Sequence, residues 1–253
     1  MTRFILAVLI AALSFSSASA FEIVTLIDRT GTTKTDILLG ASEAETAKYY
    51  PDGEMPSQVL AFLVKTKGGG ILFDTGLPDG RIAEELTKNG LAPEDVRTIL
   101  LTHLHGDHYG GLVNAEGKAA FPNAEVYVSK PEYDYWVNEL KDKKVISALS
   151  LYDVRQFIFG DEVVDGVRAI DTTGHTPGHV SYLVEDDGGK FIIAGDIIHF
   201  QTIQLANPEV AVKYDVDPEK AVQSRKFLFG YAAQKKIPVA GMHIIPPGII
   251  NLH

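Results

Sequence analysis

Short apolar runs alternate with polar, glycine-containing turns along this chain of 253 residues. Apolar runs of about four to eight residues bounded by turn residues are typical of buried strands. They predict strands at 21–28, 57–67, 71–73, 96–101, 125–128, 167–171, 180–185, 191–194 and 237–240. Apolar positions at helical spacing predict helices at 79–89, 131–140 and 218–234. The polar segment from Thr30 to Pro56 lacks clear periodicity and predicts a loop, with one helical turn near 43–49.

Glycine turns separate two pairs of the predicted strands. Gly68-Gly69-Gly70 lies between 57–67 and 71–73, and Asp186-Asp187-Gly188-Gly189 lies between 180–185 and 191–194. Two apolar runs joined by such a turn predict an antiparallel hairpin. The chain therefore contains at least two hairpins, with helices between the strands.

The first twenty residues have the pattern of a secretory signal peptide. Arg3 supplies a positive start, Phe4–Leu13 is an apolar run too short to span a bilayer, and Ala18-Ser19-Ala20 forms a small-residue cleavage site. A buried N-terminal helix is the alternative. We expect cleavage after Ala20, a single domain at 21–253, and a periplasmic or secreted protein that does not span a membrane.

Composition narrows the chemistry. The chain has no cysteine, which excludes thiolate metal ligands and a cysteine nucleophile. Its formal net charge is −10 and it has no run of lysines and arginines, so neither nucleic acid nor an anionic membrane surface is an expected partner. A small molecule is the expected partner.

The stretch THLHGDHYGG, from Thr102 to Gly111, carries the strongest chemical signal. It holds three of the eight histidines directly after the apolar run at 96–101. His103 and His105 are two residues apart, so an extended chain points both side chains the same way. Asp107 and His108 are adjacent, so they diverge and can serve a second centre. A polar loop with surface histidines is the alternative, but imidazole and carboxylate groups crowded this closely favour a metal such as zinc.

The stretch resembles the HxHxDH signature of the metallo-β-lactamase fold superfamily. Further ligands expected from that resemblance are found in order: His175 in TGHTPGH, Asp196 in FIIAGD and His243 in AGMH. The resemblance implies an α+β fold, a four-layer αββα metallo-β-lactamase sandwich. It also implies that Asp74, in the DTG sequence, braces the metal-binding loop.

The same resemblance implies a binuclear centre of two divalent metal ions, with zinc expected. One ion would be held by His103, His105 and His175, the other by Asp107, His108 and His243, with Asp196 bridging them. A hydroxide shared by the two metals would be the nucleophile. Asp107 would be a catalytic residue that orients the hydroxide and carries a proton to the leaving group.

The second half of the chain resembles a branch that includes methyl parathion hydrolase and lactonases, in the runs GHTPGHVSYLVE, GDIIHFQTIQLANPEV and YDVDPEKAVQSRKF. That branch implies a hydrolase of lactones, carboxylic esters or phosphotriesters, which export of the chain would place outside the cytoplasm. Relatives in this branch are often dimers, which makes a homodimer an expectation for this chain. Acyl-homoserine lactonases carry a tyrosine three residues after the bridging aspartate. His199 stands there in this chain, as a catalytic candidate that donates a hydrogen bond to the substrate or, alternatively, as a structural histidine.

Three other functions fit the same motif. A mononuclear iron oxidoreductase of the persulfide dioxygenase type would need fewer ligands than this chain offers. A β-lactamase of this superfamily would carry cysteine or serine near Asp196. A non-catalytic metal-binding protein is the third alternative, since fold alone does not determine function.

Several aromatic and apolar residues are candidates for the pocket wall, with ordinary packing as the alternative for each. Those near the ligands are Tyr109 and Phe200, and those in the first loop are Tyr49, Tyr50 and Met55. The mixed segment 141–160 offers Leu151, Tyr152, Phe157, Ile158 and Phe159. His179 is expected to pack behind the ligands rather than to contact the substrate.

Overall fold

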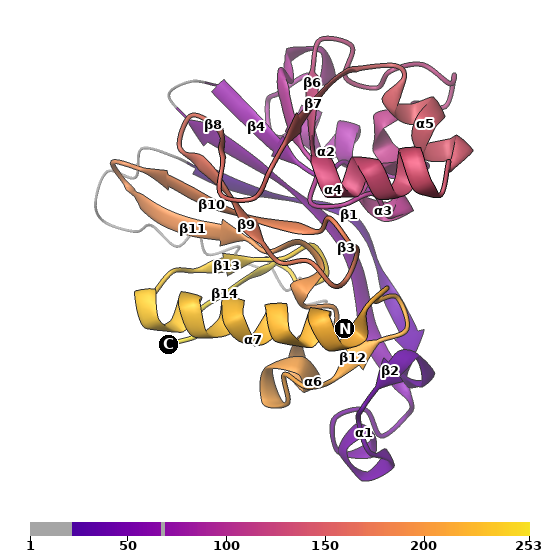
Figure 1. Ribbon diagram of the computed structural model, residues 1–253, viewed down its shortest axis with the longest axis vertical. Helices are drawn as coiled ribbons and strands as arrows, with labels where there is room; N and C mark the ends of the chain where they lie inside the picture. The colour runs from indigo at the N-terminus through magenta and orange to yellow at the C-terminus, as the bar shows by residue number, and fades with distance from the viewer. Residues whose placement is uncertain (1–21, 67–68) are drawn as a thin grey trace, which may run out of the picture.

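The computed structural model describes residues 22–66 and 69–253 of the chain. The expected signal peptide, Phe21 and Gly68 of the first glycine turn lie outside the described residues. Two six-stranded sheets lie face to face, with helices on their outer faces (Figure 1). The predicted four-layer αββα sandwich of the α+β class is therefore confirmed.

Each sheet combines strands from one half of the chain. The first sheet has the order β1 (Glu22–Lys34), β3 (Glu54–Thr66), β4 (Gly69–Phe73), β5 (Thr98–Leu100), β6 (Glu125–Ser129) and β7 (Asp153–Phe157). The second has the order β14 (Ile249–Ile250), β13 (Val239–Ala240), β11 (Gly189–Ile193), β10 (Val180–Asp186), β9 (Val167–Asp171) and β8 (Glu162–Val164). A small ribbon pairs β2 (Leu38–Leu39) with β12 (Ala211–Val212).

The helices cover the outer face of each sheet (Figure 1). On the side of the first sheet lie α2 (Ile82–Lys88), α3 (Gly106–Tyr109), α4 (Lys130–Tyr133) and α5 (Lys143–Leu149), and α4 continues into a π-helical turn at Asp134–Glu139. On the side of the second lie α6 (Gln201–Ala206) and α7 (Pro218–Lys235). The short helix α1 (Glu43–Tyr49) lies at the tip of the arm formed by β1 and β3.

Alternation along the central strands explains the layering. In β3, Leu60, Phe62 and Val64 point into the core between the two sheets, whereas Ala61 and Leu63 point into the core beneath the helices. Successive side chains of a strand face opposite sides, so a strand that is buried on both faces is apolar throughout. The same alternation in β11 sends Phe191 and Ile193 between the sheets and Ile192 toward α7. The predicted hairpins β3–β4 and β10–β11 are both antiparallel pairs.

The prediction of an irregular loop from Thr30 to Pro56 is wrong at both ends. β1 continues to Lys34 and β3 begins at Glu54, and the two strands stay paired over this length. The side chains there are largely polar and exposed, and the ion pair Lys34–Glu54 (2.6 Å) joins the two strands. A pair of strands without an apolar face shows no hydrophobic alternation in its sequence, which is why the ends of β1 and β3 were not predicted. The helical turn at 43–49 is confirmed as α1.

Other elements differ in their bounds. The helix predicted at 79–89 covers Ile82–Lys88, and the strand predicted at 237–240 covers only Val239–Ala240. The segment 141–160 contains α5 and β7, which its mixed composition did not indicate. The helix predicted at 218–234 is confirmed, with the Asp217 carboxylate accepting from the Lys220 N–H at its N-cap.

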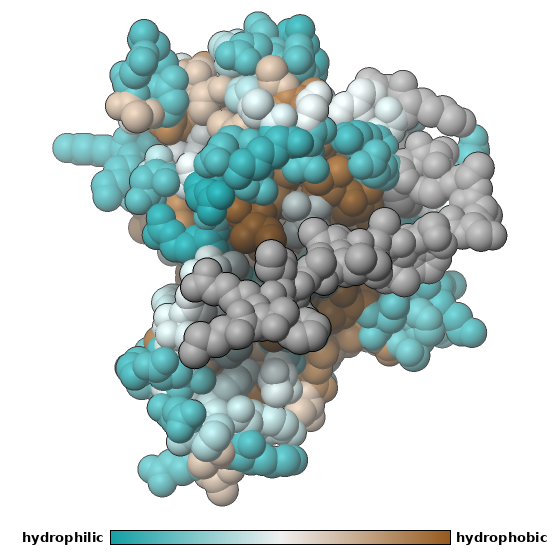
Figure 2. All heavy atoms as spheres, turned by 180° about the vertical axis from the view of Figure 1, so that it is seen from behind, coloured by the Kyte–Doolittle hydropathy of each residue, from teal (hydrophilic) through white to brown (hydrophobic). Residues whose placement is uncertain are grey.

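Hydrophilic residues dominate the upper and lower parts of the face seen in Figure 2, and hydrophobic residues reach the surface between them. Within 22–66 and 69–253, no helix has the length and apolar character needed to cross a bilayer.

Candidate metal centre

The loop after β5 carries four of the predicted ligands, and hydrogen bonds to the Asp74 carboxylate hold it in place. The Asp74 carboxylate accepts from the Thr102 N–H and the Thr102 hydroxyl, both at 2.8 Å. Its Oδ2 also lies 2.7 Å from Nδ1 of His108. Gly111 packs so closely on the Thr75 carbonyl that a Cβ would collide with it. Asp74 thus braces the loop, as the sequence predicted.

The other ligands come from the second sheet. His175 follows β9, Asp196 follows β11 and His243 follows β13, while the loop of His103 follows β5. All four segments leave the carboxyl ends of their strands. The pairing of β11 with β13 is parallel, which places Asp196 and His243 at the same sheet edge. The fold therefore gathers residues that are up to 140 positions apart in sequence, from His103 to His243.

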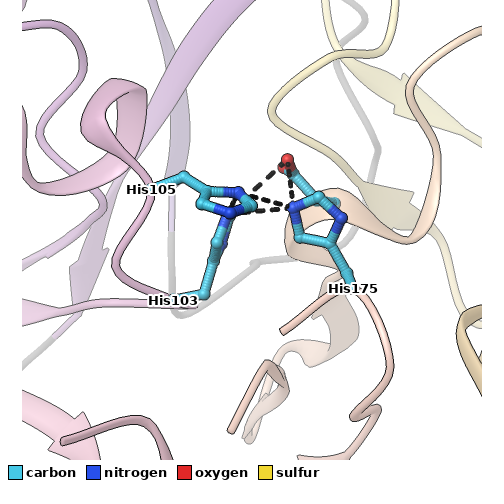
Figure 3. Close-up of side chains that lie close together, drawn as sticks. His103, His105 and His175 are labelled. Carbon is cyan, nitrogen blue, oxygen red and sulfur yellow. Dashed lines mark hydrogen bonds and ion pairs between the residues drawn. The ribbon is translucent and has the colours of Figure 1, made fainter. Parts of the chain in front are cut away.

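Three imidazoles converge on one point (Figure 3). Nε2 of His103 and Nδ1 of His105 are 3.0 Å apart, and Nε2 of His175 lies 2.9 Å from that same Nδ1. The third edge of the triangle, between the Nε2 atoms of His103 and His175, is 3.2 Å. Oδ2 of Asp196 lies 3.2 Å from Nε2 of His175. These four residues form one group able to hold a metal ion.

A second group lies beside the first. Nε2 of His243 is 3.5 Å from Oδ2 of Asp107, and Nε2 of His108 is 3.7 Å from Oδ1 of Asp107. Asp196 reaches this group too, because its Oδ1 lies 3.2 Å from His108 Nε2 and its Oδ2 lies 3.1 Å from His243 Nε2. The structure thus brings together all seven predicted ligands, with Asp196 between the two groups.

Buried polar atoms that make no hydrogen bond show whether the two groups suit metal ions. Nε2 of His108 and Oδ1 of Asp196 are buried and make no hydrogen bond within the described residues. Buried polar atoms are nearly always satisfied, so two such atoms that face each other at 3.2 Å without a hydrogen bond fit a cation held by both. Imidazole and carboxylate donors in this number suit zinc and similar divalent ions.

The pKa values of the ligand histidines shift in two directions, according to whether burial or the neighbouring carboxylates dominate. Burial lowers the pKa of His103 well below its usual value and that of His105 to about 3. Both are therefore neutral, which is the form that binds metals. Burial also opposes the charged form of His108, but Asp196, Asp107 and Asp74 outweigh it and raise its pKa. The excess of carboxylate charge around His108 is the charge that a bound cation would neutralise.

Three ligand histidines are oriented through their other ring nitrogen. Nδ1 of His108 faces Asp74, Nδ1 of His175 lies 2.8 Å from Oδ1 of Asp215, and Nδ1 of His243 lies 2.6 Å from the Gln58 carbonyl. An imidazole that donates Nδ1–H to such a partner directs its Nε2 toward the metal. Asp215 was missed in the sequence, where nothing in YDVDPEK distinguishes it from the helix N-cap Asp217.

A cavity of about 340 Å³ opens onto the two groups. His199 and Phe200 line it, as predicted, and His199 Nε2 lies 3.1 Å from Asp196 Oδ2. His179 packs behind the ligands, where its Nε2 accepts the Asp196 N–H, so its predicted packing role is confirmed. The rest of the lining comes from β1, β3 and the segment before α7: Thr33, Ser57, Gln58, Val59 and Tyr214.

Most of the other pocket candidates belong to the ordinary core or surface. Tyr50 and Met55 pack with Phe200 in a cluster beside α6, with Tyr49 against it. Phe157 and Phe159 pack between the sheets, Tyr152 and Tyr109 pack under the helices, and Leu151 and Ile158 are exposed. None of these lines the cavity. Ordinary packing, the alternative, holds for the packed residues, whereas Leu151 and Ile158 are exposed and fit neither the pocket wall nor the core. Apolar residues that pack against the core and residues that line a pocket have the same composition, which is why the sequence did not separate them.

A four-layer αββα sandwich with two adjoining His/Asp groups at its loop edge defines a class of metal-binding proteins. The model of the metallo-β-lactamase superfamily matches residues 55–235, and the chain belongs to that superfamily. An N-acyl homoserine lactonase of Bacillus thuringiensis is 30% identical over 199 residues, which is 67% of this chain and 74% of the relative. Another from a Bacillus species is 32% identical over 157 residues, and the match spans only 59% of its length.

Two solved structures share most of the fold. A hydrolase named AbOPH, of the β-lactamase superfamily, has a TM-score of 0.85 at 34% identity, covering 93% of this chain and 91% of its own. The dizinc quorum-quenching lactonase AidC, in complex with its product N-hexanoyl-L-homoserine, has a TM-score of 0.83 at 25% identity, covering 91% and 90%.

Proposed function

We propose that the chain is a metal-dependent hydrolase with two divalent ions, zinc expected, that opens neutral lactones and cleaves carboxylic esters or phosphotriesters. N-acyl homoserine lactones are the first substrates to test. The observation that carries the proposal is Asp196, whose two oxygens face two groups of histidines at the floor of one cavity. Similarity to lactonases and to the hydrolase AbOPH supports the substrate classes.

The cavity lining favours an uncharged substrate. Outside the two ligand groups it consists of hydroxyl, amide, aliphatic and aromatic residues with Gly106 and His199, and no lysine or arginine of the described chain lines it. A substrate carboxylate or phosphomonoester would lack a cationic side chain to bind it. This supports lactones, esters and triesters over β-lactams, which carry a carboxylate.

The ligand residues define the expected chemistry. His103, His105, His175 and Asp196 would hold one ion, and Asp107, His108, His243 and Asp196 the other. Two divalent ions, when bound, would supply the Lewis acidity that lowers the pKa of water and polarises the oxygen of the scissile bond. Burial raises the pKa of Asp107, but His108 and His243 outweigh it and lower the net value. Asp107 is therefore ionised at neutral pH and can accept a proton beside the cavity and pass it to the leaving group.

His199 is suited to bind the substrate oxygen. Its Nδ1 is buried without a hydrogen-bond partner among the described residues, its Nε2 lies 3.1 Å from Oδ2 of Asp196, and its ring stacks on His243 at 5.2 Å between centroids. Burial lowers its pKa, so the ring is neutral and keeps one N–H to donate. We propose that this N–H donates to the carbonyl or phosphoryl oxygen of the substrate.

Replacing His199 with phenylalanine keeps a flat ring beside His243 but removes the donor. We expect kcat for a lactone to fall about 100-fold, the loss typical of removing one oxyanion donor, with metal content unchanged. Steady-state kinetics and metal analysis of the same preparation check this. The exposed terminal histidine supplies the matched control His253→Phe, which should behave like the wild type. Loss of one metal ion in His199→Phe would instead make His199 a ligand.

Metal content and a substrate panel together test the proposed function. Purified protein should hold about two zinc-like ions per chain and turn over an N-acyl homoserine lactone, an aryl ester or a phosphotriester. One bound iron with no hydrolysis, but oxygen consumption with a thiol persulfide, would move the protein to the oxidoreductase alternative. Hydrolysis of a β-lactam alone would make it a β-lactamase, and two metals with no turnover of the panel would favour a binding role.

We further propose that the protein is exported and forms a homodimer, from the pattern of residues 1–20 and the resemblance described above. Mass spectrometry of the protein from the periplasm or medium should give a chain that begins at Phe21. Sedimentation should give twice the mass of that chain. An intact N-terminus in the cytoplasm would overturn export, and a monomer would overturn the dimer.

A further inference from the structure

Glu132 is a fully buried carboxylate that connects the two halves of the first ligand group. It follows β6 in the first turn of α4, and its side chain is 0% exposed. Oε1 accepts the Leu104 N–H at 2.9 Å and the indole N–H of Trp136 at 2.7 Å. Oε2 accepts the Thr176 hydroxyl at 2.7 Å and the Gly178 N–H at 2.9 Å. Four donors thus converge on one side chain.

These donors belong to the loops that present the ligands. Leu104 lies between His103 and His105, and Thr176 directly follows His175. Trp136, which shares Oε1, places its ring edge-on against His105, with centroids 5.6 Å apart. Glu132 therefore joins a loop of the first sheet to a turn of the second, behind the point where the three imidazoles meet.

The contacts are confined to one of the two ligand groups. None of the four hydrogen bonds of the Glu132 carboxylate involves Asp107, His108 or His243. The second group has its own buried carboxylate, Asp74, which faces His108 and Thr102. Each ligand group is thus braced by a different acidic residue.

We propose that Glu132 is a positioning residue that sets the spacing of His103 and His105 against His175, and so controls the metal affinity of that group alone. The inference rests on the proposed binding of two metals, but not on any particular substrate. Only a side chain with two acceptor oxygens satisfies all four donors. A glutamine amide would turn its NH₂ toward a backbone N–H in either orientation, either that of Leu104 or that of Gly178, and leave that donor unpaired.

The test is metal retention by Glu132→Gln, measured without substrate. The metal-loaded protein is dialysed against rising chelator concentrations, and the metal left per chain is counted. In Glu132→Gln we expect one ion to leave at about tenfold lower chelator than in the wild type, and the other to leave as before. The exposed Glu139, in the adjoining π-helical turn, supplies the matched control Glu139→Gln, because its side chain makes no hydrogen bond or ion pair with the described residues.

Two further readouts assign the lost site. The visible spectrum of Co²⁺ retained by Glu132→Gln should match that of His105→Ala and differ from that of His108→Ala. Trp136, the only tryptophan of the chain, reports on the same spot, so its fluorescence response to added metal should shift to higher metal concentration in the variant. If Glu132→Gln does not fold, Thr176→Val removes a single donor to Oε2 and should give the same selective loss, with a smaller change.

Parallel loss of both ions, or retention like that of the wild type, would overturn the positioning role. Failure of the proposed function gives a different result. A wild-type protein that binds two metals but hydrolyses none of the panel would overturn the hydrolase assignment, while selective metal loss in Glu132→Gln would still support the role of Glu132.

Discussion

Replacement of Asp196 by asparagine is expected to reduce lactone or ester turnover by about 1000-fold and to lower the metal content below two ions per chain. The Asp196 carboxylate faces His175 with Oδ2 and His108 with Oδ1, and the fold offers no other described carboxylate between the two groups. An amide keeps the shape but replaces one acceptor oxygen with a donor. Losing several kcal/mol of charge stabilisation corresponds to about three powers of ten in rate.

The measurement is kcat with metal analysis on the same sample, and the circular dichroism spectrum checks the fold. The backbone N–H of residue 196 donates to His179 with aspartate or asparagine at this position, so the local turn is not expected to change. Asp165→Asn is the matched control, because Asp165 is exposed in the turn between β8 and β9 and its side chain makes no hydrogen bond or ion pair within residues 22–66 and 69–253. Full activity of Asp196→Asn with two bound ions would refute the bridging role and, with it, the binuclear mechanism.

Much of the architecture could be predicted because the signals are local. Apolar runs such as Leu60–Val64 are buried on both faces, and their length and turn residues predict the strands directly. The ligand set could be predicted because HxHxDH packs four donors into one loop. The remaining ligands, His175, Asp196 and His243, each end or follow a recognisable apolar strand, and the structure places them where the resemblance implied.

The residues that brace the centre could not be predicted for the opposite reason. Asp215 reaches His175 across 40 positions, and Glu132 reaches Thr176 across 44. Neither has a neighbour in sequence that reveals its partner, because the contact exists only after the two sheets pack. A single acidic residue near a helix start is more often a cap or an exposed charge, so the sequence offers no reason to place these two carboxylates in the core.

The burial of Arg225 also could not be predicted, because arginine is rarely buried without an acidic partner. It lies in α7 with an exposure of 0%, and its guanidinium donates to the carbonyls of Ile197, Pro208 and Val210 at 2.7–2.9 Å. Burial lowers its pKa to about 10, which still leaves it charged at neutral pH. These carbonyls flank the segment that carries His199 and Phe200. The hydrogen bonds of Arg225 therefore attach this part of the cavity wall to α7.

Replacing Arg225 with methionine is therefore expected to lower the free energy of unfolding by about 3 kcal/mol. The carbonyl of Val210 keeps the amide of Gln204 as a donor, but the carbonyls of Ile197 and Pro208 lose the guanidinium as theirs. A buried acceptor left without a donor costs about 1–3 kcal/mol, which sets the size of the effect.

Urea denaturation of chelator-treated protein measures the free energy of unfolding without the contribution of bound metal. The matched control is Arg97→Met, at an exposed arginine whose side chain makes no hydrogen bond or ion pair with the described residues. It should change the free energy of unfolding by less than about 0.5 kcal/mol. An equally small change in Arg225→Met would mean that water or the relaxed loop replaces the guanidinium, and that the cavity wall does not depend on it.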